Sequence, residues 1–81
     1  MSTRTKIKEH AEACGWRLTA DVDPVVSFRR STRNINVFFT FNGNVLEANV
    51  IDDGDENPRW VIRYRDKNKL SKVKAMLSEF R

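Results

Sequence analysis

An Asn42-Gly43 dipeptide between two runs of β-branched and aromatic residues is the feature that most constrains this chain. The runs are NINVFFTF, residues 34–41, and NVLEANVI, residues 44–51. Asn-Gly accepts the positive φ angles of a two-residue type I′ turn, so the pattern predicts a β-hairpin. A two-residue turn places Phe39 opposite Leu46, whereas a slip by one residue places Phe39 opposite Glu47 and mixes the two faces.

The predicted register sorts the hairpin side chains onto two faces. The core face pairs Phe41 with Asn44, Phe39 with Leu46, Val37 with Ala48 and Ile35 with Val50. The other face, called the open face below, carries Asn36, Phe38 and Thr40 against Asn49, Glu47 and Val45. Phe38 is therefore the aromatic residue that we expect on the solvent side of the hairpin.

The remaining segments read as two amphipathic helices and two further strands. Apolar spacing and end signals predict a helix over residues 3–14, strands over residues 25–30 and 59–65, and a helix over residues 66–80, with residues 19–23 as a connection. The order α-β-β-β-β-α predicts one α+β domain, residues 1–81. Short connections favour a four-stranded antiparallel meander with both helices packed on one face. Outside the hairpin, the expected core residues are Ile7, Ala11, Cys14, Val26, Phe28, Trp60, Ile62, Leu70, Val73, Leu77 and Phe80.

The open face is the first candidate binding surface. Aligning Trp60 with Val50 produces one row across the strands with Phe38, Glu47 and Arg63, and a neighbouring row with Asn36, Asn49 and Val61, near Arg29. An aromatic ring among arginine and asparagine side chains can stack a nucleic-acid base. A Glu47–Arg63 ion pair partly covered by Phe38 is the structural alternative.

The second candidate surface consists of basic residues. The chain carries a net charge of +4, which is compatible with an acidic partner. Arg29, Arg30 and Arg33 surround the turn before the hairpin, where guanidinium groups can hold phosphate or protect a sheet edge from aggregation. Four lysines lie in the last helix: Lys67, Lys69, Lys72 and Lys74. These residues are compatible with a nucleic-acid partner or with a solvated basic surface.

No residue pattern predicts a metal, a cofactor or a catalytic centre. The acidic run over residues 52–56 lacks the spacing of an EF-hand loop and reads as a solvated loop. His10 and Cys14 have helical i, i+4 spacing, but no second pair of ligands completes a metal site. Gly-rich phosphate loops and the G-x-S-x-G motif are missing, and we expect a non-enzymatic protein.

Cysteine content and hydropathy indicate a compartment. The single cysteine cannot form an internal disulfide, which fits a reducing cytosol. No apolar run approaches the roughly 18 residues of a membrane span, and the N-terminus lacks the apolar region of a signal peptide. We therefore expect a cytoplasmic protein without a membrane partner.

Four segments together resemble small proteins of actinobacteria and their phages. They are Gly15-Trp16-Arg17-Leu18-Thr19, Phe28-Arg29-Arg30, Val37-Phe38-Phe39-Thr40-Phe41 and Gly43-Asn44-Val45-Leu46-Glu47-Ala48. The resemblance spans residues 15–48, somewhat under half of the chain. Most proteins of this kind have no assigned activity, and the resemblance implies that this chain, like some phage examples, binds a host protein as an accessory factor.

Two partners remain from the sequence. A host protein or a second copy would meet the open face or an edge strand, and the residues expected there are Arg29, Arg30, Arg33, Asn36, Phe38, Glu47, Asn49, Arg63 and Arg65. Nucleic acid would instead meet Arg29, Arg30, Arg33, Lys67, Lys69, Lys72 and Lys74. Because the expected topology places the lysines and the strand arginines on opposite layers, we rank the protein partner slightly first.

Overall fold

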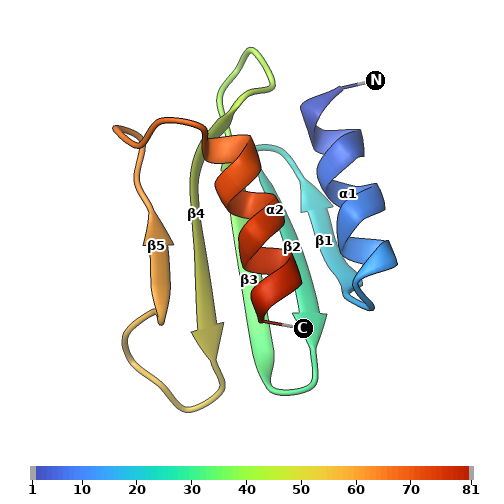
Figure 1. The fold of residues 1–81 in the computed structure, drawn as a ribbon, viewed down its shortest axis with the longest axis vertical. Coiled ribbons are helices and arrows are strands. Elements are labelled where there is room, and N and C mark those ends of the chain that lie inside the picture. The colour runs from blue at the N-terminus through green and yellow to red at the C-terminus, as the bar shows by residue number, and fades with distance from the viewer. Residues whose placement is uncertain (1, 81) are drawn as a thin grey trace.

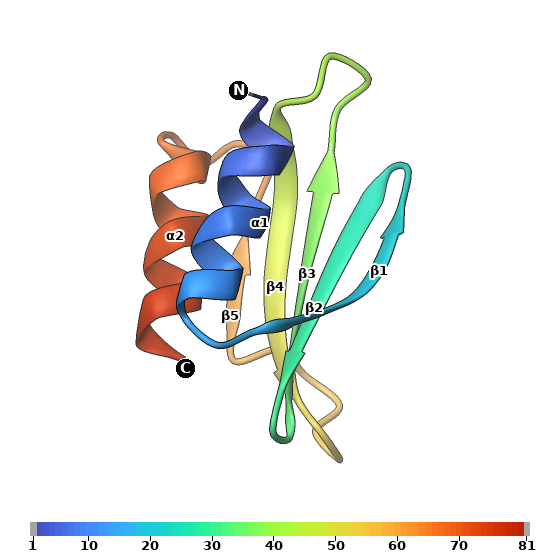
Figure 2. The ribbon, with the colours of Figure 1, turned by 90° about the vertical axis from the view of Figure 1, so that its right-hand side faces the viewer.

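Two layers make up the computed structural model, which describes residues 2–80 (Figures 1 and 2). One layer is an antiparallel sheet in the order β1-β2-β3-β4-β5, and both helices cover one of its faces. The elements are α1 (Thr3–Ala13), β1 (Arg17–Val22), β2 (Val25–Arg30), β3 (Arg33–Phe39), β4 (Val45–Asp52), β5 (Trp60–Ile62) and α2 (Lys69–Glu79). The α+β meander is confirmed, but the sheet has five strands rather than four.

The unexpected strand is β1, in a segment that we interpreted as a connection. It pairs with β2 through Leu18 opposite Phe28 and Val22 opposite Val25, with a bulge between Leu18 and Ala20. No residue of β1 is buried. An edge strand without a buried face has no alternating apolar pattern, and this explains why the sequence did not reveal it.

Helix α1 begins at the expected residue and ends one residue earlier than predicted, with Cys14 as its C-cap. The Ser2 hydroxyl accepts a hydrogen bond from the Thr5 amide (3.1 Å), and Ile7 and Ala11 are the buried residues of the helix. Gly15 follows the helix with φ of +85°. The Trp16 amide then donates to the Ala11 carbonyl (2.9 Å), which completes a Schellman-type ending.

Helix α2 begins three residues later than predicted, and β5 ends three residues earlier. Asp66 does not cap the helix, since its carboxylate accepts a hydrogen bond from the Arg63 amide (3.0 Å) within the connecting loop. The buried side of the helix consists of Val73, Met76 and Leu77. Leu70 and Phe80 are only partly buried, and the buried position of Met76 was not predicted.

The β3–β4 hairpin keeps the predicted register in its body but not at its loop. Ile35 pairs with Val50 and Val37 pairs with Ala48, as expected. The loop contains three residues, since the Thr40 amide donates to the Asn44 carbonyl (2.7 Å) and the Gly43 amide to the Thr40 carbonyl (2.9 Å). Gly43 has φ of +86°, as in a turn followed by a left-handed residue. The prediction of a two-residue type I′ turn was therefore wrong.

The three-residue loop would shift the strand register by one residue, and a β-bulge between the loop and the hairpin body restores the predicted register. Phe39 pairs with Val45 instead of Leu46, while Phe38 still pairs with Glu47. Val45 therefore enters the core, and Leu46 is 38% exposed. Phe41, predicted on the core face, lies in the loop and is fully exposed.

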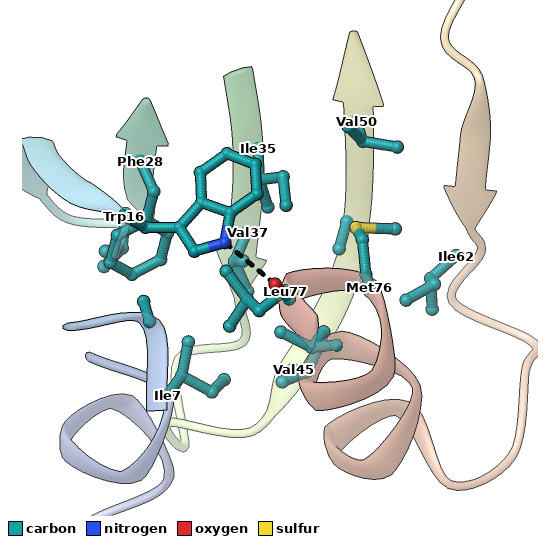
Figure 3. Close-up of a cluster of buried hydrophobic side chains, with 14 of the residues drawn as sticks. Ile7, Trp16, Phe28, Ile35, Val37, Val45, Val50, Ile62, Met76 and Leu77 are labelled. Carbon is teal, nitrogen blue, oxygen red and sulfur yellow. Dashed lines mark hydrogen bonds between the residues drawn. The ribbon is translucent and has the colours of Figure 1, made fainter. Parts of the chain in front are cut away.

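The core lies between the sheet and the helices and is entirely apolar among the described residues (Figure 3). Trp16, which follows α1, is buried in it, and its indole Nε1 donates a hydrogen bond to the Leu77 carbonyl (2.8 Å). No buried polar or charged residue occurs within residues 2–80. Candidate binding residues are therefore found at the surface.

Candidate functional site

The open face has no helix over it, because α1 and α2 both lie on the opposite side of the sheet (Figure 2). Strand register arranges its side chains in three rows. The first row is Val22, Val25, Phe38 and Glu47; the second is Ala20, Ser27, Asn36, Asn49 and Val61; the third is Arg17, Arg29, Asn34 and Ile51. The rows differ in chemistry, so each is described separately.

An apolar strip lies at the end of the open face near the β3–β4 loop and consists of Val22, Val25, Phe38 and Leu46. Val22 is 71% exposed, and Val25 and Phe38 are half-buried beside it. Phe38 has Glu47 in its row and Asn36 and Asn49 in the neighbouring row, as predicted, but Val22 and Val25 complete its row and Arg63 does not join it. Val22 was missed because it belongs to the unpredicted strand, and Leu46 was missed because it was assigned to the core.

The second row is a chain of side-chain hydrogen bonds across three strands. The Ser27 hydroxyl donates to Asn36 Oδ1 (2.7 Å), and Asn36 Nδ2 donates to Asn49 Oδ1 (3.1 Å). The alignment of Trp60 with Val50 is confirmed, and Asn49 accordingly lies opposite Val61. This row separates the apolar strip from Arg29, so Phe38 and Arg29 do not form one cluster.

Arg29 is paired with an acid on the open face. Its Nη1 donates to Asp53 Oδ1 (3.1 Å) and to Asn34 Oδ1 (3.0 Å), while Nη2 contacts Asp53 Oδ2. The hydrogen bond from Arg29 is the main reason that the pKa of Asp53 lies below its ordinary value. The guanidinium is thus engaged within the chain.

Arg30 and Arg33 point to the helix side, where each reaches the end of a helix. Arg30 Nη1 donates to the Cys14 carbonyl at the end of α1. Arg33 Nη1 donates to the Phe80 carbonyl at the end of α2 (3.3 Å), and its guanidinium lies 5.2 Å from the centre of the Phe80 ring. Positive charge is favourable at the carboxyl end of a helix. These contacts give both arginines a structural role that we did not predict.

The acidic residues after β4 complete this cluster. Asp52 pairs with Arg33 Nε (3.0 Å) and with Arg59 Nη1 (2.8 Å). The β4–β5 loop and the β2–β3 turn meet at one end of the sheet (Figure 1). Asp52 and Asp53 are therefore ion-paired. Asp55 and Glu56 are exposed, as expected for a solvated loop.

Arg63 and Arg65 lie beyond the end of β5, in the loop that leads to α2. The expected Glu47–Arg63 ion pair is not formed, since the ion pairs within residues 2–80 involve other residues. Arg65 instead lies over the ring of its neighbour Tyr64, 5.5 Å from the ring centre. The structure thus brings neither arginine into a row of the open face.

The four lysines belong to α2 or the loop before it, on the layer opposite the open face (Figure 1). Lys69 Nζ donates to the Tyr64 carbonyl (3.1 Å) and the Asp66 carbonyl (3.2 Å), so it holds the loop before the helix. Lys67, Lys72 and Lys74 make no ion pair with another described residue. The lysines and Arg29 consequently face opposite directions.

His10 and Cys14 join the two helices. His10 Nε2 lies 2.9 Å from the Ser78 hydroxyl and 3.1 Å from the Lys74 carbonyl, and Cys14 Sγ lies 3.9 Å from the same hydroxyl. Across residues 2–80, no three His, Cys, Asp or Glu side chains are grouped so that they could hold a metal ion. The pair therefore functions in helix packing.

Comparison with known proteins leaves the function to be argued from the geometry. No protein-family model matches the sequence, and no curated protein or solved structure matches it. None of the described helices combines the length and the apolar character that crossing a membrane requires.

Proposed function

We propose that this chain is a small non-catalytic protein-binding module of the cytosol, and that it docks a partner protein on the apolar strip of the open face. The exposed strip carries the proposal: Val22, Val25 and Phe38 are neighbours in one row where the sheet has no helical cover, and the exposed bulge residue Leu46 follows in β4. Apolar side chains grouped on an uncovered face are typical of interaction sites. The sequence resemblance supports a host protein as the partner of a phage accessory factor.

The open face is a better candidate than either edge strand. β5 contains only three residues, and β1 has a bulge together with charged Arg17 and Asp21. Short strands, bulges and charges are the features by which proteins prevent edge-to-edge pairing. A partner that adds a strand to this sheet is thus disfavoured at both edges.

The charged side chains also favour the apolar strip. Arg29, Arg30 and Arg33 are each engaged within the chain, so a phosphate group would have to displace an existing partner. Nucleic acid remains the second candidate because Lys67, Lys72 and Lys74 have no acidic partner among the described residues. Those lysines would bind phosphate on the helix layer, away from the strip.

Phe38→Arg is the variant that tests the strip. Phe38 lies opposite Glu47, so the new guanidinium can pair with that carboxylate and the strand pairing is retained. Ser71→Arg adds the same charge at an exposed position of α2 and serves as the matched control. We expect tagged wild type and Ser71→Arg to capture the same protein from an actinobacterial lysate, and Phe38→Arg to lose at least about 90% of it, because central interface residues dominate affinity.

Three results would separate the alternatives. Equal capture by folded wild type and Phe38→Arg would remove the apolar strip as the docking site. Loss with both variants would indicate a general effect of added positive charge. Nucleic acid that elutes from all three proteins as salt is raised would favour the lysine surface, since phosphate contacts weaken steeply with salt.

A further inference from the structure

A cavity of about 510 Å³ lies outside the open face, at the end of the sheet where α1 begins. Its walls come from three segments that are distant in sequence: the start of α1, the β1–β2 turn and the β3–β4 loop. The lining residues are Ser2, Arg4, Asp23, Pro24, Phe39, Thr40, Phe41 and Gly43. Its volume falls within the range of about 300–1,000 Å³ that is typical of small-ligand pockets.

The walls of the cavity suit an aromatic ring. Pro24 and Phe39 supply apolar surface, and the Arg4 guanidinium lies 5.0 Å from the centre of the Phe39 ring. A guanidinium above one ring can also contact a second ring that enters beside it. Arg4 also pairs with Asp23, the one acid of the lining.

The chain presents such a ring at the rim of the same cavity. Phe41 occupies the first position of the three-residue β3–β4 loop and is fully exposed. The hydrogen bonds between Thr40 and Asn44 and between Gly43 and Thr40 close the loop, so its backbone is held without help from the phenyl ring. Phe41 therefore has no folding role in the loop that would explain an aromatic side chain there.

We propose that the cavity binds the Phe41 ring of a second copy of this chain, in a two-fold symmetric dimer in which each copy inserts its ring into the other. A projecting side chain and a cavity on one patch are what a symmetric interface requires, because the same surface of both copies then supplies both parts. Charge permits this contact. The chain as a whole is positive, but the lining holds one base and one acid that already pair.

The contact is small, and the dimer is accordingly a transient one. Sedimentation velocity over about 10 µM to 1 mM covers the range in which weak encounters form. We expect the weight-average mass of the wild type to rise from 9.5 kDa toward twice that value with concentration. Phe41→Ser, an exposed loop change that leaves the fold intact, is expected to weaken association by at least about tenfold, as for a central interface residue.

Val61→Ser is the matched control, because it removes an exposed apolar side chain from β5, away from the cavity. We expect it to associate like the wild type. A mixed sample of isotope-labelled and unlabelled protein supplies the second measurement: intermolecular NOEs from the Phe41 ring to Pro24 and Phe39 are expected. A wild type that stays monomeric to about 1 mM, association that survives Phe41→Ser, or NOEs only within one copy would each overturn the proposal.

This site and the apolar strip can fail independently. Phe38→Arg tests the open face, and Phe41→Ser tests the cavity, so loss of one interaction leaves the other to be measured. A dimer that forms in both wild type and Phe38→Arg would support the cavity whatever the host partner does.

Discussion

Helices α2 and α1 lie on the same face of the sheet and both bury apolar side chains there, but the strand beside α1 is also held by ion pairs. α2 packs on β4 and β5 through three fully buried side chains, Val73, Met76 and Leu77. The contacts between α1 and β1 include ion pairs: Arg4 and Lys8 both reach Asp21, and the Lys8 Nζ–Asp21 Oδ2 distance is 2.8 Å. We call these two regions the α2 side and the β1 side.

The β1 side is expected to be the less stable of the two, and it takes part in both proposed binding surfaces. Strand β1 contributes no buried residue, and it lies at the edge of the sheet beside β2. Half-exposed ion pairs contribute little stability compared with buried apolar surface. The β1 side also carries Val22 of the apolar strip and the Asp23-Pro24 wall of the cavity. Both proposed binding surfaces thus include the region that we expect to open first.

The largest expected effect comes from the same truncation on the two sides. Leu77 is completely buried, and Leu18 in β1 is 46% exposed. Leu77→Ala is expected to lower the free energy of unfolding by about 2–5 kcal/mol, through lost burial and a residual cavity. Leu18→Ala is expected to cost less than about 1 kcal/mol. Urea unfolding of both variants measures this, and similar losses would show that β1 is held as tightly as α2.

A smaller effect is expected at the carboxyl ends of the helices. Arg33 contacts the Phe80 carbonyl, the Phe80 ring and Asp52, whereas Arg30 contacts the Cys14 carbonyl. Arg33→Gln is expected to cost about 1–2 kcal/mol and Arg30→Gln about 0.3–1 kcal/mol, because both lose charge at a helix end and Arg33 also loses an ion pair. Thermal unfolding is the measurement. An equal or larger loss with Arg30→Gln would contradict the ranking of the two sides.

The sequence allowed the α2 side and the hairpin body to be predicted in most respects. Periodicity identified Val73 and Leu77, and the alternating pattern of residues 34–51 identified the pairs in the middle of the hairpin. Burial on one face leaves a repeating pattern in the residues, and a register error would expose several apolar side chains at once. For this reason the register differs from the prediction only beside the Asn42-Gly43 loop, where a bulge absorbs the additional loop residue.

The sequence revealed much less of the β1 side and of the candidate sites. β1 lacks a buried face, so its pairing with β2 depends on backbone hydrogen bonds that have no residue pattern. The roles of Arg30 and Arg33 could not be predicted, because each depends on where the end of a helix distant in sequence lies. The apolar strip likewise combines residues from four strands, and the cavity combines the start of α1, the β1–β2 turn and the β3–β4 loop. Such sites depend on tertiary arrangement rather than on local spacing.

The smallest expected effect is the pH response of the β1 side. A hydrogen bond from Lys8 is the main reason that the pKa of Asp21 lies below its ordinary value, and nearby Arg4 acts in the same direction. A lowered carboxyl pKa means that the stabilising contribution is present above the pKa of the unfolded chain, about 3.9, and is lost as pH falls through the lower pKa of the folded chain. Acidification to about pH 3 is therefore expected to weaken the contact between α1 and β1.

Amide hydrogen exchange can resolve this response by region. We expect the protection factors of β1 amides to fall more than those of α2 and β4 between about pH 6 and pH 3. Asp53 also has a lowered pKa through Arg29, but its loss acts at the opposite end of the sheet and does not select β1. Lys8→Met removes the closer of the two partners of Asp21 and is expected to make β1 exchange faster at pH 6 and less sensitive to acid. A parallel decrease in every element would mean that the chain opens as one unit, and that the ion pairs of the β1 side do not form a separate weak region.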